Sequence, residues 1–361
     1  MRNRSTYYVI VCCSILLILL HISPIHAEPA MDETTRDVLQ NSLSIVEIDH
    51  EIERIEVQQQ QIEDSRVSLE AQMSVHKEEM EAHQDRAASI VRSYYMGERD
   101  QLLQVFLKAK SLRSIQILAS YYEIIIGRDQ EVLHAYHSRQ QEFEEMTVRL
   151  NQNDAELSLL KQNLQDQRER VLTLEQEVEN TLASSDNREL MEKLIEELNT
   201  YWSNVGIHEV KRYFGALASA MNNLPSFVQQ EKGILSTNGR TYSIRISEEQ
   251  LNDFLRSENE IFNDFAFEFT DDYIIASGKR DNLELAVQGH YTVIDEPANA
   301  LLFHVDKLVF NGFELPDTTR SMLQQEFDLG FYPQKLMSFI KATDVSTEDQ
   351  TLEVTLELAL R

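Results

Sequence analysis

The strongest constraint on the fold of this chain is a heptad repeat that runs through its middle. From Ile45 to Tyr94, fifteen positions separated alternately by three and four residues include eleven apolar ones, without a change of phase. A second run with the same spacing extends from Ile115 to Val178, and neither run contains proline. Charged and amide side chains dominate the positions between the apolar ones. A repeat of about 3.5 residues sustained over this length predicts a coiled coil.

The two heptad runs are separated by about 20 residues that break the phase. Two helices of similar length around one break predict an antiparallel coiled-coil hairpin over residues 33–183. A parallel homodimer is the alternative, because it produces a similar sequence pattern. Polar residues at apolar heptad positions usually pair across a coiled coil and set its register. Several of them face each other if every pair of opposite residues has numbers that sum to 212. This register places Gln59 opposite Asn153, and His83 opposite Asp129.

The last third of the chain has a different periodicity. From Gly233 onward, apolar and polar residues alternate in four segments, at 242–246, 265–269, 283–293 and 352–360. This alternation predicts an antiparallel sheet with one buried and one wet face. Helices over 247–257, 318–328 and near 333–341 are expected to cover the buried face. We therefore predict an α+β chain in which an α+β domain over 233–361 follows the helical hairpin.

Residues 186–230 are expected to connect these two parts as helices. An apolar stripe at helical spacing continues as far as Trp202, and a second amphipathic segment starts after Gly206. Pro225 is predicted to end that second helix at about Asn222, because the residue before a proline disfavours helical backbone angles.

The N-terminus predicts export from the cytoplasm. Arg2 and Arg4 precede an apolar stretch, and the small residue Ala27 follows it at a position suited to cleavage. This order is typical of a secretory signal peptide over residues 1–27, although an uncleaved signal that tethers the protein to the membrane is the alternative. The only two cysteines are Cys12 and Cys13, so no disulfide framework is expected. We expect an extracytoplasmic protein, secreted or at the cell surface.

Charge argues against a nucleic-acid partner. The chain has 61 acidic and 33 basic residues, and its formal net charge is −28. A polyphosphate would be repelled by such a chain.

The segment between the helices, residues 96–114, combines basic and apolar side chains. One interpretation is a small helical cap that closes the hairpin. The other is a docking surface, since an exposed apolar patch with a basic rim is typical of an interaction site. The candidate partner-binding residues are Tyr94, Tyr95, Leu102, Leu103, Phe106, Lys108, Lys110 and Arg113.

This tip also carries a family resemblance. The segments 92–97 (RSYYMG), 102–107 (LLQVFL) and 111–115 (SLRSI) resemble the coiled-coil region of secreted peptidoglycan hydrolases of the PcsB/CwlO type. In that family an Arg, a Tyr and a Gly close the first helix, and a Leu-rich tip with a Ser-rich step follows. The resemblance implies an autoinhibitory or docking coiled coil that engages the extracellular part of an FtsE–FtsX membrane complex. The family's catalytic domain is missing here: beyond residue 27 there is no Cys, no His-x-His and no His-x-x-x-Asp.

A second, weaker resemblance concerns the C-terminal domain. The segment 246–255 (ISEEQLNDFL), followed by long strands, is similar to bacterial envelope domains that wrap a sheet around a helix and bind lipid-like chains. Four phenylalanines, Phe265, Phe267, Phe269 and Phe303, are candidates to line such an apolar site. A filled hydrophobic core is the alternative use of the same side chains.

No catalytic or cofactor-binding arrangement stands out in the sequence. Glu131, His134 and His137 are spaced along one helical face, but we interpret them as an exposed cluster because a closed metal site needs more ligands. We therefore predict no cofactor or metal. The predicted function is a non-enzymatic adaptor or regulator of peptidoglycan hydrolysis or division, docking through the tip on a membrane or cell-wall protein such as an FtsEX-like complex. The alternative is a carrier or sensor of a lipid-like ligand.

Overall fold

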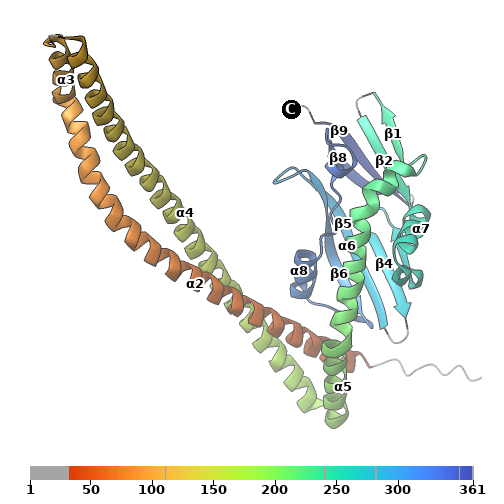
Figure 1. The fold of residues 1–361 in the computed structure, drawn as a ribbon. Helices are drawn as coiled ribbons and strands as arrows, with labels where there is room; N and C mark the ends of the chain where they lie inside the picture. Colours follow the sequence, from red (N-terminus) through yellow and green to blue (C-terminus); the bar gives the residue numbers. More distant parts are fainter. Residues whose placement is uncertain (1–31, 110, 240, 281–282, 349, 360–361) are drawn as a thin grey trace, which may run out of the picture.

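A computed structural model describes residues 32–359, except 110, 240, 281, 282 and 349. The predicted signal peptide, residues 1–27, lies outside the described residues. The fold is α+β, as predicted: a long antiparallel helical hairpin is followed by antiparallel sheets packed with helices (Figure 1). Among the described residues, no helix is both long enough and apolar enough to cross a bilayer.

The hairpin consists of two long helices joined by a short one. These are α2 (Glu33–Tyr95), α3 (Glu98–Leu107) and α4 (Leu112–Ser184). Gly97 ends the first long helix with a φ of 72°, a left-handed conformation that glycine adopts without strain. Ser111 begins α4, because its hydroxyl accepts a hydrogen bond from the backbone N–H of Ser114 at 3.2 Å.

The register of the hairpin differs from the predicted one. His76 lies opposite Glu142, and Val38 clusters with Leu182, so the paired numbers sum to 218 and 220 rather than 212. The two helices are thus displaced by about one heptad from the predicted pairing. Asp129 pairs with Arg99 instead of His83, because a guanidinium is always charged and can neutralise a buried carboxylate.

The connecting region is almost continuously helical. It consists of α5 (Arg188–Tyr201), a π-turn η1 (Trp202–Gly206) and α6 (Ile207–Gln230). The prediction that Pro225 ends the second helix was wrong, since α6 continues five residues beyond it. Pro225 and its neighbours Leu224 and Val228 are buried. Burial of this apolar face offsets the hydrogen bond that the proline cannot donate.

The C-terminal domain has two antiparallel sheets where the sequence suggested one. The first has the order β1-β2-β9-β8 and the second the order β3-β4-β5-β6-β7. Their strands are β1 (Leu235–Asn238), β2 (Thr241–Ser247), β3 (Phe265–Phe269), β4 (Ile274–Arg280), β5 (Leu283–Ile294), β6 (Ala300–Phe310), β7 (Phe313–Glu314), β8 (Ile340–Glu348) and β9 (Thr351–Leu358). Helix α6 lies across them, and its apolar face joins one core with both sheets (Figure 1).

Shorter helices complete this domain. They are α7 (Glu248–Glu258), the 3-10 turn η2 (Glu260–Asp264), α8 (Asp317–Glu326) and α9 (Pro333–Leu336). A capping box begins α7: Ser247 and Gln250 each accept a hydrogen bond from the other's backbone N–H. The helix expected near 333–341 is shorter than predicted, because the chain enters strand β8 at Ile340.

Candidate functional site

The far end of the hairpin exposes an unusual amount of apolar surface. In the described part of the chain, more than half of the exposed large hydrophobic side chains lie between residues 91 and 124. They come from the end of α2, from α3 and from the start of α4. The set is Val91, Tyr94, Tyr95, Met96, Leu103, Val105, Leu112, Ile115, Ile117, Tyr121 and Ile124. Soluble proteins rarely leave such a cluster uncovered unless it binds something.

Several of the predicted tip residues belong to this surface. Tyr95 is 90% exposed, and Tyr94 and Leu103 are exposed to about half that extent. Lys108 and Arg113 are also exposed. The side chains of Leu102 and Phe106, and all of Lys110, lie outside the described residues. The tip therefore presents aromatic, aliphatic and cationic groups together.

One tip cation has a structural role instead. The Nη2 of Arg99 donates a hydrogen bond to Oδ1 of Asp129 at 2.9 Å, and its Nε lies 2.8 Å from Oδ2. The same guanidinium lies 5.9 Å from the centre of the Tyr94 ring. Arg99 thus fastens α3 to α4, which fixes the turn that the docking surface is built on.

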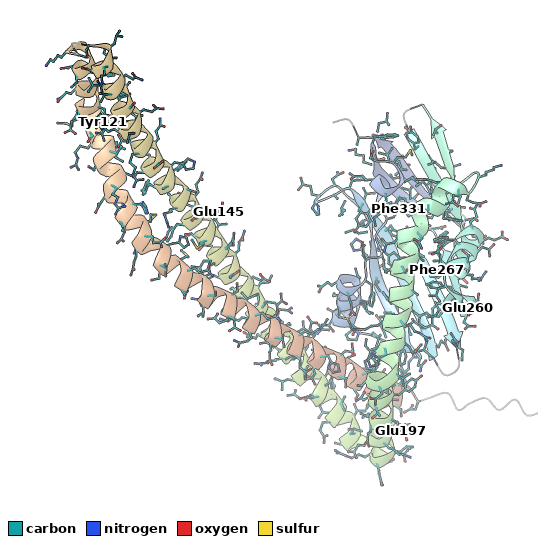
Figure 2. The ribbon with its side chains drawn as sticks, in the orientation of Figure 1. Tyr121, Glu145, Glu197, Glu260, Phe267 and Phe331 are labelled. Carbon is teal, nitrogen blue, oxygen red and sulfur yellow. The ribbon has the colours of Figure 1, made fainter. Side chains whose placement is uncertain are left out.

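A stripe on α4 was not predicted from the heptad pattern. Ile117, Tyr121 and Ile124 are spaced by four and three residues, so they lie along one helical face. Asp129 and Met146, which are buried, lie on a different face of α4, the one that contacts α2. Figure 2 shows Tyr121 near the end of the hairpin. The stripe could have been found in the sequence as a second apolar periodicity, out of phase with the first.

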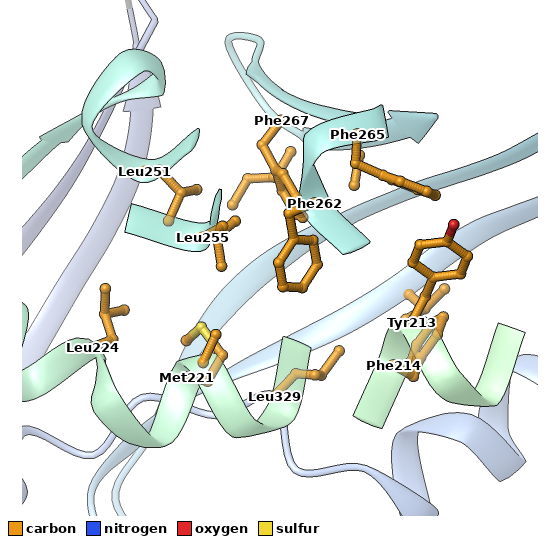
Figure 3. Close-up of a cluster of buried hydrophobic side chains, with 14 of the residues drawn as sticks. Tyr213, Phe214, Met221, Leu224, Leu251, Leu255, Phe262, Phe265, Phe267 and Leu329 are labelled. Carbon is orange, nitrogen blue, oxygen red and sulfur yellow. The ribbon is translucent and has the colours of Figure 1, made fainter. Parts of the chain in front are cut away.

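The second candidate site is an apolar cavity in the C-terminal domain. It has a volume of about 70 Å³ and lies between α6, α7 and the second sheet (Figure 3). Phe265, Phe267 and Phe303 line it, as the sequence suggested, whereas Phe269 is buried elsewhere in the core. A neighbouring cavity of about 30 Å³ shares Met221 and Tyr291 with it.

This cavity is small and has almost no polar lining. The Tyr291 hydroxyl donates a hydrogen bond to the carbonyl oxygen of Leu329 at 3.4 Å, and burial raises the pKa of this phenol above its ordinary value. An engineered apolar cavity that binds benzene measures about 150 Å³, so the space here is about half as large. As packed, the four phenylalanines mainly fill a core.

The root of the hairpin is fixed to the C-terminal domain by side chains that the sequence analysis did not single out. Gln40 on α2 pairs with the backbone of Glu314 at the edge strand β7: its Oε1 accepts the N–H at 2.7 Å, and its amide nitrogen donates to the carbonyl oxygen. The side-chain amide thus occupies the sheet edge as a further strand would.

Other polar contacts reinforce this junction. Arg36 donates to the carbonyl oxygen of Gly312 at 2.8 Å, and Arg170 on α4 donates to Asp317 on α8 at 2.8 Å. Partial burial pushes the pKa of Asp317 upward, but the hydrogen bond and positive charge of Arg170 outweigh it and hold this pKa below its ordinary value. Both long helices of the hairpin are therefore attached to the domain.

The histidine cluster does not form a metal site. Glu131 is paired with Arg128 at 3.2 Å on an exposed face. Within the described ranges, no group of three or more His, Cys, Asp or Glu side chains is placed to hold an ion. Neither His134 nor His137 therefore belongs to a metal centre in this part of the structure.

Comparison with known proteins adds no relative. No family model matches the chain, and no curated protein or solved structure matches it significantly.

Proposed function

We propose that this protein is a non-enzymatic, extracytoplasmic adaptor that regulates peptidoglycan hydrolysis or division. It docks through the hairpin tip on a membrane-borne protein partner, such as an FtsEX-like complex. The observation that carries the proposal is the concentration of exposed apolar side chains at the tip, with Tyr95 and Leu112 the most exposed of them. The resemblance of segment 92–115 to the PcsB/CwlO coiled coils supports the choice of partner.

The shape of the molecule suits an adaptor. Helix α4 has 73 residues, which corresponds to a length of about 110 Å at 1.5 Å per residue. Its far end lies well away from the C-terminal domain (Figure 1). Because Gln40 and Arg170 fix the root of the hairpin, a partner bound at the tip is held at a defined distance from that domain.

A binding measurement with the extracellular region of FtsX tests this proposal. The triple variant Tyr95→Ser, Ile117→Ser, Tyr121→Ser should weaken binding by about a hundredfold, since buried aromatic anchors dominate interface energies. A matched control replaces three exposed apolar residues along the shaft, Val57→Ser, Val148→Ser and Leu159→Ser, and should bind normally. Equal binding by both variants would contradict tip docking. Release of soluble fragments from purified peptidoglycan by the wild-type chain would contradict the non-enzymatic role.

The second candidate function is binding of a lipid-like apolar ligand, and the almost wholly apolar lining of the 70 Å³ cavity favours it. Because the cavity is small, a ligand would have to displace side chains such as Met221. Native mass spectrometry of the full chain from its own cells should then show an added acyl-chain mass. The cavity-filling variant Ala276→Leu should lose that mass. Finding only the bare chain in the wild type would count against this function.

A further inference from the structure

The tip and the helix ends beside it have a small excess of basic residues, unlike the rest of the molecule. Between residues 91 and 128 the sequence has six basic and three acidic residues, whereas the whole chain has a net charge of −28. Two of the six are paired with acidic side chains, Arg99 with Asp129 and Arg128 with Glu131. Arg92, Lys108 and Arg113 are exposed. The end of the hairpin thus has positive charge at its surface.

The apolar groups of the tip are not confined to one face. Ile117, Tyr121 and Ile124 lie on a face of α4 that does not contact α2. Tyr95 and Met96 extend from the end of the other long helix. A layer of lipid headgroups can contact these different faces at the same time.

The kinds of side chain match that environment. Tyrosine is enriched at the level of lipid headgroups, where its ring and hydroxyl face different surroundings. Lysine and arginine place their apolar stems beside the lipid and their charges among anionic headgroups. Tyr95, Tyr121, Lys108 and Arg113 present this combination at one end of the molecule.

The chain as a whole is acidic, but the long hairpin separates most of its negative charge from anionic headgroups at the tip. Charges in water are screened over about 8 Å at physiological salt. The C-terminal domain is attached at the root of the hairpin and lies well away from the tip (Figure 1), so its negative charge is screened at the tip. Asp129, the first acidic residue of α4 after Glu123, is already paired with Arg99.

We infer that the hairpin tip binds directly to an anionic lipid bilayer, with its tyrosines and aliphatic side chains at headgroup level and its cations on the lipid charges. The inference rests on the proposed function in that it uses the same tip, and it adds a contact that needs no protein partner. An anionic membrane would thereby orient the hairpin before or during docking.

Vesicle flotation with the purified chain tests the inference. The chain should begin at residue 28, because the apolar segment before it would itself bind lipid, and the whole described fold lies beyond that point. Vesicles of phosphatidylglycerol and phosphatidylcholine should carry the chain upward, vesicles of phosphatidylcholine alone should carry much less, and added salt should release it.

Two tip variants separate the charge from the apolar contribution. Lys108→Glu with Arg113→Glu should weaken binding to the anionic vesicles at least about tenfold. Tyr95→Ser with Tyr121→Ser should lower binding to a similar extent and also abolish quenching of a fluorophore at residue 103 by lipid-borne quenchers. Since all four positions are exposed, circular dichroism should show unchanged helix content and thermal unfolding.

Shaft variants serve as matched controls. Arg149→Glu with Lys161→Glu changes the net charge equally but far from the tip, and should leave flotation unchanged. Equal loss in the tip and shaft charge variants would show attraction by net charge alone and would overturn the inference. Wild-type chain that fails to float while still binding FtsX through the tip would leave the proposed function intact and make the tip a protein-binding surface only.

Discussion

Glu47 on helix α2 accepts a hydrogen bond from the indole nitrogen of Trp202, 2.5 Å away and 155 residues later in the chain. The other carboxylate oxygen accepts a hydrogen bond from the hydroxyl of Thr319 on α8 at 2.6 Å. Glu47 is 5% exposed and Trp202 is fully buried. One side chain therefore joins the hairpin, the π-turn and the C-terminal domain.

Replacement of Glu47 should loosen this junction. Glu47→Ala leaves the Trp202 and Thr319 donors buried without a partner, and we expect the free energy of unfolding to fall by about 2 kcal/mol. Urea unfolding followed by Trp fluorescence measures this directly, because Trp202 is the only tryptophan. Distances between spin labels at the tip and on α8 should also become more widely distributed.

A neighbouring surface glutamate provides the control for this experiment. Glu53 is exposed, and its carboxylate lies 3.7 Å from the exposed His50, so Glu53→Ala should change the free energy of unfolding by less than about 0.5 kcal/mol. Equal spin-label distributions in the wild type and in Glu47→Ala would show that the carboxylate does not hold the hairpin in place.

Gly206 should tolerate no side chain. A Cβ at this position would lie 2.5 Å from the Trp202 ring and 2.8 Å from the Phe310 ring, which are both fully buried. Gly206→Ala should therefore lower the free energy of unfolding by at least about 2 kcal/mol. Gly127→Ala offers a contrast, since nothing lies within 4 Å of a Cβ there. That change should stabilise α4 by about 0.5–1 kcal/mol, and thermal unfolding of both variants checks the opposite signs.

The hairpin could be predicted from the sequence because its apolar residues repeat over many turns without interruption. Its register could not, since apolar positions of similar size fit equally well after a shift of one heptad. The choice between registers depends on a few polar contacts. Arg99, which lies outside both heptad runs, takes the partner that the sequence assigned to His83.

The C-terminal domain could also be predicted from the sequence only in part. Strands with strict alternation, such as β3, were predicted, whereas β4, β6 and β8 were missed. In β6 and β8 one residue without a cross-strand partner, Asp306 and Thr343 respectively, shifts the register. The junction was not predictable from local pattern at all. Gln40, Glu47 and Thr319 are each ordinary in their own segments, and only the tertiary structure brings them together.

The observed register predicts which positions can be crosslinked. The chain has no cysteine beyond residue 13, so an introduced pair has no other thiol in the hairpin or the C-terminal domain to react with. His76→Cys with Glu142→Cys should be crosslinked readily within a monomer by a short thiol-reactive reagent, because the Nδ1 of His76 and the Oε2 of Glu142 are 3.9 Å apart. Gln59→Cys with Asn153→Cys, the pair from the predicted register, should crosslink much more slowly. Non-reducing gel electrophoresis measures both, and faster reaction of the second pair would contradict the observed register.

The ion pair between Arg170 and Asp317 predicts a pH-dependent contribution to stability. Because the pKa of Asp317 is lowered in the folded chain, the contribution is present at neutral pH, above the carboxyl's unfolded pKa. It is lost as the pH falls through the lowered folded value, where the carboxyl becomes protonated. Both side chains are substantially exposed, so Arg170→Ala should cost no more than about 1 kcal/mol at pH 7. Urea unfolding of the wild type and of Arg170→Ala, from neutral to acidic pH, should show the difference in their free energies of unfolding shrinking toward zero. A difference that persists after Asp317 is protonated would assign the effect to packing of the arginine stem.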